Sequence, residues 1–155
     1  MSDAVAVDSR PSTWAHINEV QRRLMQVVVR LQERLLVHDA SKLQSPEVEA
    51  FDAQEGALAA TTYGSDEYRS QLHELGPALE HHYSVNDHHP DHFAGGIAEM
   101  DLIQLTEMLA DWKAATMRHN DGDLMRSIVQ NRDRFKYGPE IQQVLINTAK
   151  NLGWL

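Results

Sequence analysis

The residues best suited to chemistry lie in one short run, His38-Asp39-Ala40-Ser41-Lys42. The imidazole of His38 and the carboxylate of Asp39 could share one metal ion, and the ammonium group of Lys42 could hold an anion beside it. Because sequential residues do not share a helix face, joint ligation requires an ion placed beside the helix. The alternative is a surface histidine at a helix C-terminus next to a solvated aspartate.

A second candidate is a cluster of histidines, since six of the nine lie between His73 and His92. His82 continues an apolar helical stripe, so we expect its side chain to point inward. The chain leaves the helix after Tyr83, which allows His88 and His89 to turn back on the same centre. The alternative is a polar turn held by hydrogen bonds.

Two carboxylates and one further histidine complete the candidate set. Glu107 and Asp111 are four residues apart, so they share one helix face, and Arg118 follows on roughly the same side. A solvated acidic face is the alternative. His16 lies on an apolar stripe and could equally be a buried core histidine. It is 22 residues from His38, about 33 Å in a continuous helix, so the helix breaks near residues 30–34 or the two histidines serve different places.

Composition limits the protein classes that fit. A chain of 155 residues predicts one domain, and the lack of cysteine restricts any metal site to nitrogen and oxygen ligands. The formal net charge of -9 argues against a nucleic-acid polymer as partner but not against a nucleotide. No apolar run is long enough for a membrane span, and no signal peptide is readable. We therefore expect no membrane partner and a cytoplasmic location.

The elements that must position these groups are predicted to be helices throughout. We find no strand alternation and expect an all-α, compact single-domain bundle of about six helices. Helix starts are indicated after Pro11, at Ser45-Pro46-Glu47, at Asp101 and at Gly138-Pro139. The second of these is expected to end near Gln54, before a loop over residues 56–64. Residues 1–10 are expected to be a flexible tail and residues 11–155 a single helical metal-binding domain.

The run from His38 to Lys42 resembles the HD-x-x-K core of the HD-domain metal-dependent phosphohydrolases. That resemblance implies a helical fold in which a first histidine, the HD pair and a later aspartate bind one or two divalent ions. The positions that correspond are His16, then His38 and Asp39, and finally Asp111. Further histidines for a second ion would be His82 with His88 or His89, and Lys42 would lie near substrate phosphate.

The chain from His16 to about Leu145 also resembles a small family found in phage and bacterial genomes. Its pattern includes HD-x-SKL, H-x-x-x-N-x-HH and EM-x-x-DW, which here are His38–Leu43, His82–His89 and Glu107–Trp112. This second resemblance does not indicate which activity the chain has.

Together these observations predict a divalent-metal-dependent phosphohydrolase acting on a nucleotide or a similar small phosphate ester. One or two ions would be bound by His38, Asp39 and Asp111 with one or more of His82, His88 and His89. Imidazole and carboxylate ligands suit Mn, Fe, Co, Ni or Zn better than Mg.

In this hypothesis Lys42 and Arg118 neutralise substrate charge, and Glu107 orients a ligand histidine or acts as a base. One alternative is a non-catalytic metal-containing module that sequesters a nucleotide or signalling ligand, or binds a host protein. Another is a structural helical protein whose histidines form a hydrogen-bond network. An oligomer is possible, with Trp154-Leu155 as an apolar docking point.

Overall fold

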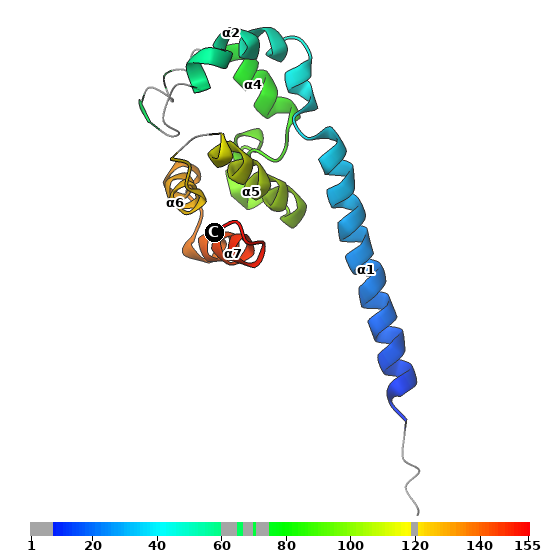
Figure 1. Cartoon of the computed structure of the whole chain (residues 1–155). Helices are drawn as coiled ribbons and strands as arrows, with labels where there is room; N and C mark the ends of the chain where they lie inside the picture. Colours follow the sequence, from blue (N-terminus) through cyan, green and yellow to red (C-terminus); the bar gives the residue numbers. More distant parts are fainter. Residues whose placement is uncertain (1–7, 60–64, 67–69, 71–74, 119–120) are drawn as a thin grey trace, which may run out of the picture. The chain divides into compact units, whose positions relative to one another are not determined.

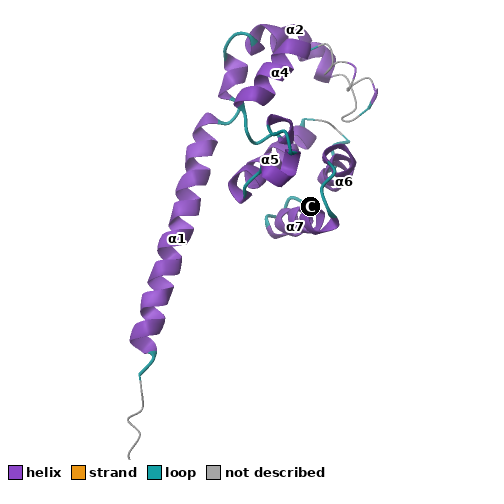
Figure 2. Ribbon diagram, turned by 180° about the vertical axis from the view of Figure 1, so that it is seen from behind, coloured by secondary structure: helices purple, strands orange, loops and turns teal. Residues whose placement is uncertain are grey.

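All regular structure in the described part of the chain is helical. The computed structural model describes residues 8–59, 65–66, 70, 75–118 and 121–155, and no strand occurs within them (Figure 2). The predicted all-α class with about six helices is confirmed. The α-helices are α1 (Arg10–Val37), α2 (Glu47–Ala59), α4 (Gly76–Val85), α5 (Leu102–Met117), α6 (Leu124–Phe135) and α7 (Pro139–Asn151). None of the described helices combines the length and apolar character needed to cross a membrane.

The chain divides into two compact units, Met1–Leu36 and Val37–Leu155. The division falls near the end of α1, inside the range 11–155 that is predicted to be one domain. The physical reason is that α1 buries none of its side chains. The unit Val37–Leu155, in contrast, contains the buried hydrophobic cluster of the protein.

Helix α1 is one continuous element of 28 residues (Figure 1). No glycine or proline lies between His16 and His38, so nothing in this stretch forces a turn. The helix runs through residues 30–34 without interruption, so the predicted alternative of a helix break in this range is wrong.

The core of the unit Val37–Leu155 is built mainly from α5, α6 and α7. Asp101 caps α5 by accepting from the Ile103 and Gln104 amides, which confirms the helix start predicted there. The Trp112 ring stacks on Phe135 at a centroid distance of 6.2 Å. The buried hydrophobic residues of this core are Ile97, Met108, Leu109, Trp112, Leu124, Ile128, Tyr137, Leu145 and Ala149. This core fixes α5, the helix that carries Glu107 and Asp111.

A second packed group consists of α2, α4 and the short 3-10 helix Ala40–Leu43. α2 begins at Glu47, as the Ser-Pro-Glu signal indicates, but it extends to Ala59, so the predicted end near Gln54 is wrong. The predicted loop lies partly outside the described residues. α4 has Pro77 in its first turn and is capped at Asn86, after which two 3-10 helices, Pro90–His92 and Gly96–Glu99, lead to α5.

Candidate metal centre

Four segments of the unit Val37–Leu155 bring their polar side chains to one place. They are the turn after α1, the start of α2, the end of α4 with the turn that follows it, and the middle of α5. Asp39 has a φ of 54°, in the left-handed region that aspartate tolerates better than most residues. This residue separates α1 from the 3-10 helix Ala40–Leu43, so the chain turns where its first candidate ligands lie.

The central group consists of Asp39, His82, His88 and His89, whose ligand atoms all lie within 4.8 Å of one another. Asp39 Oδ1 is 3.4 Å from His82 Nε2 and 3.4 Å from His88 Nε2. His82 Nε2 is 2.9 Å from His89 Nε2. Atoms bound at 2.0–2.1 Å to a tetrahedral ion lie about 3.4 Å apart, so these four atoms fit a small divalent ion.

Two atoms of this group are buried without a hydrogen-bond partner among the described residues: Asp39 Oδ1 and His88 Nε2. A buried polar atom left unpaired costs about 1–3 kcal/mol, so folded proteins rarely tolerate two that face each other. A cation between these atoms would satisfy both, because a carboxylate oxygen and an unprotonated imidazole nitrogen each offer a lone pair.

Glu47 contacts the polar side chains on one side of the cluster. Its side chain is fully buried, and its carboxylate lies 2.9 Å from His82 Nδ1 and 2.7 Å from His81 Nδ1, and accepts from Ser41 Oγ at 3.0 Å. A proton on His82 Nδ1 donated to Glu47 leaves the lone pair of His82 Nε2 directed at the central group. This carboxylate–histidine arrangement is the one that typically orients metal ligands.

Glu107 contacts two histidines on the other side of the cluster. Its Oε1 atom is 2.8 Å from His38 Nδ1 and 3.3 Å from His88 Nδ1. One carboxylate on α5 therefore contacts the Nδ1 atoms of two imidazoles, which leaves their Nε2 atoms for ligation. These contacts fit the expected orienting role of Glu107, although Glu107 also forms a possible ligand group with His38 and His88.

A further possible ligand group contains His38, Asp39 and Asp111. His38 Nε2 lies 3.6 Å from Asp39 Oδ2 and 3.9 Å from Asp111 Oδ1. Asp39 thus presents Oδ1 to the histidine-rich group and Oδ2 to this one. Lys42 Nζ lies 2.6 Å from the same Oδ2 atom, so the predicted lysine is part of the site.

The electrostatics of the central group favour neutral imidazoles, whereas the hydrogen bond to Glu107 raises the pKa of His38. Burial lowers the pKa of His82, lowers that of His88 to about 4 and lowers that of His89 to about 2. These three side chains are therefore uncharged at neutral pH, which is the form that binds metals. Burial raises the pKa of Asp111. Burial also acts to raise the pKa of Asp39, but Lys42 and the neighbouring histidines outweigh it and the net shift is downward.

Residues 7–151 match a family of unknown function, DUF5662. The chain belongs to DUF5662. No curated protein and no solved structure matches it significantly. The DUF5662 match spans α1 and the whole candidate metal centre, and the family has no assigned function that could be transferred to either.

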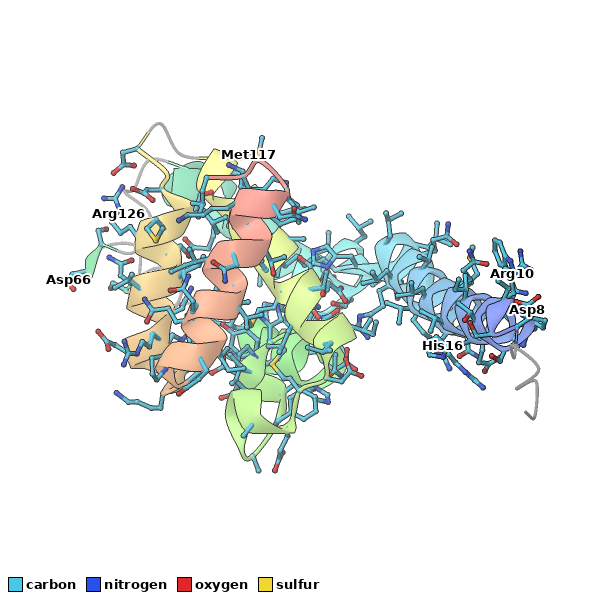
Figure 3. The ribbon with its side chains drawn as sticks, turned by 90° about the horizontal axis from the view of Figure 1, so that it is seen from below. Asp8, Arg10, His16, Asp66, Met117 and Arg126 are labelled. Carbon is cyan, nitrogen blue, oxygen red and sulfur yellow. The ribbon has the colours of Figure 1, made fainter. Side chains whose placement is uncertain are left out.

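Two of the predicted site residues of this DUF5662 protein lie outside the possible ligand groups among the described residues. His16 lies on α1, twenty residues before Leu36, or about 30 Å of helix rise (Figure 3). It belongs to the unit Met1–Leu36 and is absent from every possible ligand group among the described residues. Arg118 is exposed at the end of α5, about 10 Å of rise beyond Asp111.

The sequence predicts no role at the candidate centre for Glu47 or Asn86, although both contact His82. It indicates Glu47 only as an acidic residue in the first turn of a helix, and nothing local indicates that this residue is buried. Asn86 donates to Ser41 Oγ at 2.8 Å and to the His82 carbonyl at 2.9 Å. Its position four residues after His82 was the available signal, because an asparagine there can close the helix and hold its neighbour.

Proposed function

We propose that this DUF5662 protein is a divalent-metal-dependent phosphohydrolase that acts on a nucleotide or a similar small phosphate ester. The observation that supports the proposal most is the pair of buried, unpartnered atoms, Asp39 Oδ1 and His88 Nε2, 3.4 Å apart. The resemblance of His38–Lys42 to the HD-domain phosphohydrolases supports the reaction class.

The donor set indicates which ions fit. The histidine-rich group offers three imidazole nitrogens and one carboxylate oxygen. Nitrogen-rich sites of this kind favour Mn, Fe, Co, Ni or Zn, whereas Mg prefers oxygen ligands and retained waters. The group of His38, Asp39 and Asp111 offers one nitrogen and two carboxylates, and it would hold a second ion with Asp39 shared between the two.

A divalent ion bound here would lower the pKa of a coordinated water and polarise a phosphoryl oxygen. The protein's own residues supply the rest. Glu47 and Glu107 hold the imidazoles in fixed tautomers, so that little reorganisation accompanies the reaction. Lys42 is 36% exposed and paired with Asp39, so its ammonium group is placed to neutralise an incoming phosphate.

The test begins with metal analysis of the purified protein and with its metal affinity after chelation. Protein loaded with Mn or Co is then screened for phosphate release from nucleotides and small phosphate esters. We expect His38→Ala, His88→Ala and Asp111→Ala to lose activity. His92→Ala is the matched control, because His92 is exposed and contacts the Tyr83 carbonyl instead of the cluster.

Undiminished phosphate release in all three cluster variants would end the assignment. Tight nucleotide binding without turnover in metal-loaded protein would instead favour the non-catalytic binding module. A protein that takes up no divalent ion, and whose melting a chelator does not change, would favour the purely structural hydrogen-bond network.

A further inference from the structure

Helix α1 is unusual for the number of large apolar side chains that it leaves exposed. No residue of α1 is buried, and each of eleven such side chains is more than one-third exposed. They are Trp14, Ile17, Val20, Leu24, Met25, Val27, Val28, Val29, Leu35, Leu36 and Val37. Such a run of exposed apolar side chains marks an interaction surface.

The intrinsic helix propensity of α1 is not sufficient to explain its stability. In proteins most helical stability comes from packing of an apolar face and not from intrinsic propensity, and β-branched residues reduce that propensity further. α1 contains three consecutive valines, Val27–Val29, at its middle. A continuous helix of 28 residues with this composition therefore requires apolar burial against a partner.

The spacing of the apolar residues indicates what kind of partner fits. Ile17, Val20, Leu24, Val27 and Leu31 follow one another at intervals of three, four, three and four residues. This alternation is the heptad pattern with which one helix packs along another, here over about two heptads. We call these five residues the α1 seam.

The charges along α1 are compatible with a second copy of the same helix. Glu19 pairs with Arg22 and Arg23 at 2.5 Å each, and Arg30 pairs with Glu33 at 2.8 Å. Glu19 shares its single negative charge between two arginines, so the helix keeps a net positive charge. None of these arginines is a seam residue, so two copies can meet along the seam without placing an arginine in it.

The available area suits a weak dimer. Full burial of an aliphatic side chain removes about 60–120 Å² and that of a tryptophan about 150–250 Å². At the observed exposures, the seam with Trp14, Val28 and Leu35 offers about 300–500 Å² per chain. Two copies would bury about 600–1,000 Å², and the upper value is the lower bound for a specific interface.

From these observations we infer that α1 is a self-association helix, through whose seam two copies of this chain form a homodimer. This inference goes beyond the proposed function and does not depend on a metal ion. The interface is near the lower limit of area, so the dimer dissociates on dilution.

The experiment measures the mass of the full-length chain by sedimentation equilibrium from about 1 to 100 µM. The monomer is 17.6 kDa, and we expect twice that mass at the higher concentrations. Leu24→Glu places a charge in the seam and should weaken the dimer at least about tenfold. Gln26→Glu is the matched control, because residue 26 is off the seam, and it should change dimer affinity less than about twofold.

A wild-type chain that stays at 17.6 kDa up to about 100 µM would overturn the inference. Equal weakening by Leu24→Glu and Gln26→Glu would also overturn it. Circular dichroism of both variants checks that the helices remain. If Leu24→Glu does not fold, Leu24→Ala replaces it, and the same order of effects is expected.

Discussion

The two units of this protein differ in which side chains they bury: one exposes apolar side chains, and the other buries polar ones. In α1 the aliphatic side chains are exposed, with Leu24 at 60% and Leu36 at 80%. In the unit Val37–Leu155 the polar groups are buried, with Glu47 at 0% and His88 at 1% exposure. Both arrangements cost free energy in an isolated chain, because apolar surface favours burial and polar groups favour water.

Different partners would stabilise the two regions. Burying more apolar surface would stabilise α1, and our inference assigns that role to a second copy of the helix. A cation would stabilise the buried cluster, since Asp39 Oδ1 and His88 Nε2 face each other without a hydrogen-bond partner in the described chain. The predictions below separate these two needs.

The largest expected effect follows from Asp39→Asn. Asparagine tolerates the left-handed backbone at this position, so the turn should persist while one anionic oxygen is lost. Asp39 belongs to two of the possible ligand groups, so we expect metal affinity to fall by more than about 100-fold. Isothermal titration with Mn or Co measures this. Asp52→Asn, exposed on α2, is the control and should bind as wild type does.

Retention of full metal affinity in Asp39→Asn would show that the cluster does not centre on this carboxylate. The buried histidines would then be explained better by a hydrogen-bond network, and the contrast with α1 would rest on packing alone.

A smaller effect is expected for Glu47→Gln. The substitution keeps the volume of the side chain but replaces an acceptor by an amide that cannot accept from both His81 and His82. His82 then loses the partner that fixes its tautomer, and metal affinity should fall about 10–100-fold. The measurement is competition against a chelator of known affinity.

Glu49→Gln is the matched control for Glu47→Gln, since Glu49 lies in the same helical turn of α2 and is exposed. Equal metal affinities in the two variants would remove Glu47 from the site and leave it as a structural carboxylate.

Acid should destabilise the metal-free protein through the buried histidines. A histidine in the unfolded chain has a pKa of about 6.5, whereas burial holds the pKa of His88 at about 4. Between these values the unfolded chain binds more protons, so the free energy of unfolding falls as pH drops from about 6.5 to about 4. His88 alone contributes a loss on the order of 3 kcal/mol.

Urea unfolding in the presence of a chelator, at a series of pH values, tests the acid effect. His88→Gln should flatten the dependence, because the titrating group is removed. A metal-free protein that is as stable near pH 4.5 as at neutral pH would contradict the burial of uncharged imidazoles.

The helices and many of the clustered residues could be predicted from the sequence, because both have local signals. The Asp101 cap, the helical periodicity and the concentration of histidines before α5 are readable over a few residues. Glu47 could not be predicted, since its contacts with His81 and His82 span 34 and 35 positions and depend on how α2 packs on α4. The position of Arg118 relative to the cluster could not be predicted from helix side alone, because Arg118 lies about two turns beyond Asp111 along the axis of α5.

The smallest effect is expected for His16→Ala, and it bears directly on the comparison between the two units. The resemblance to HD-domain proteins implied that His16 is a metal ligand, but α1 is continuous and carries His16 in the unit Met1–Leu36. We therefore expect metal affinity and phosphate release to stay within about twofold of the wild-type values. Because residue 16 flanks the seam but is not one of its five residues, we expect dimer affinity to change less than about twofold. A loss of metal affinity comparable to that of His38→Ala would mean that His16 reaches the cluster in the assembled protein, and the two regions would then form one site.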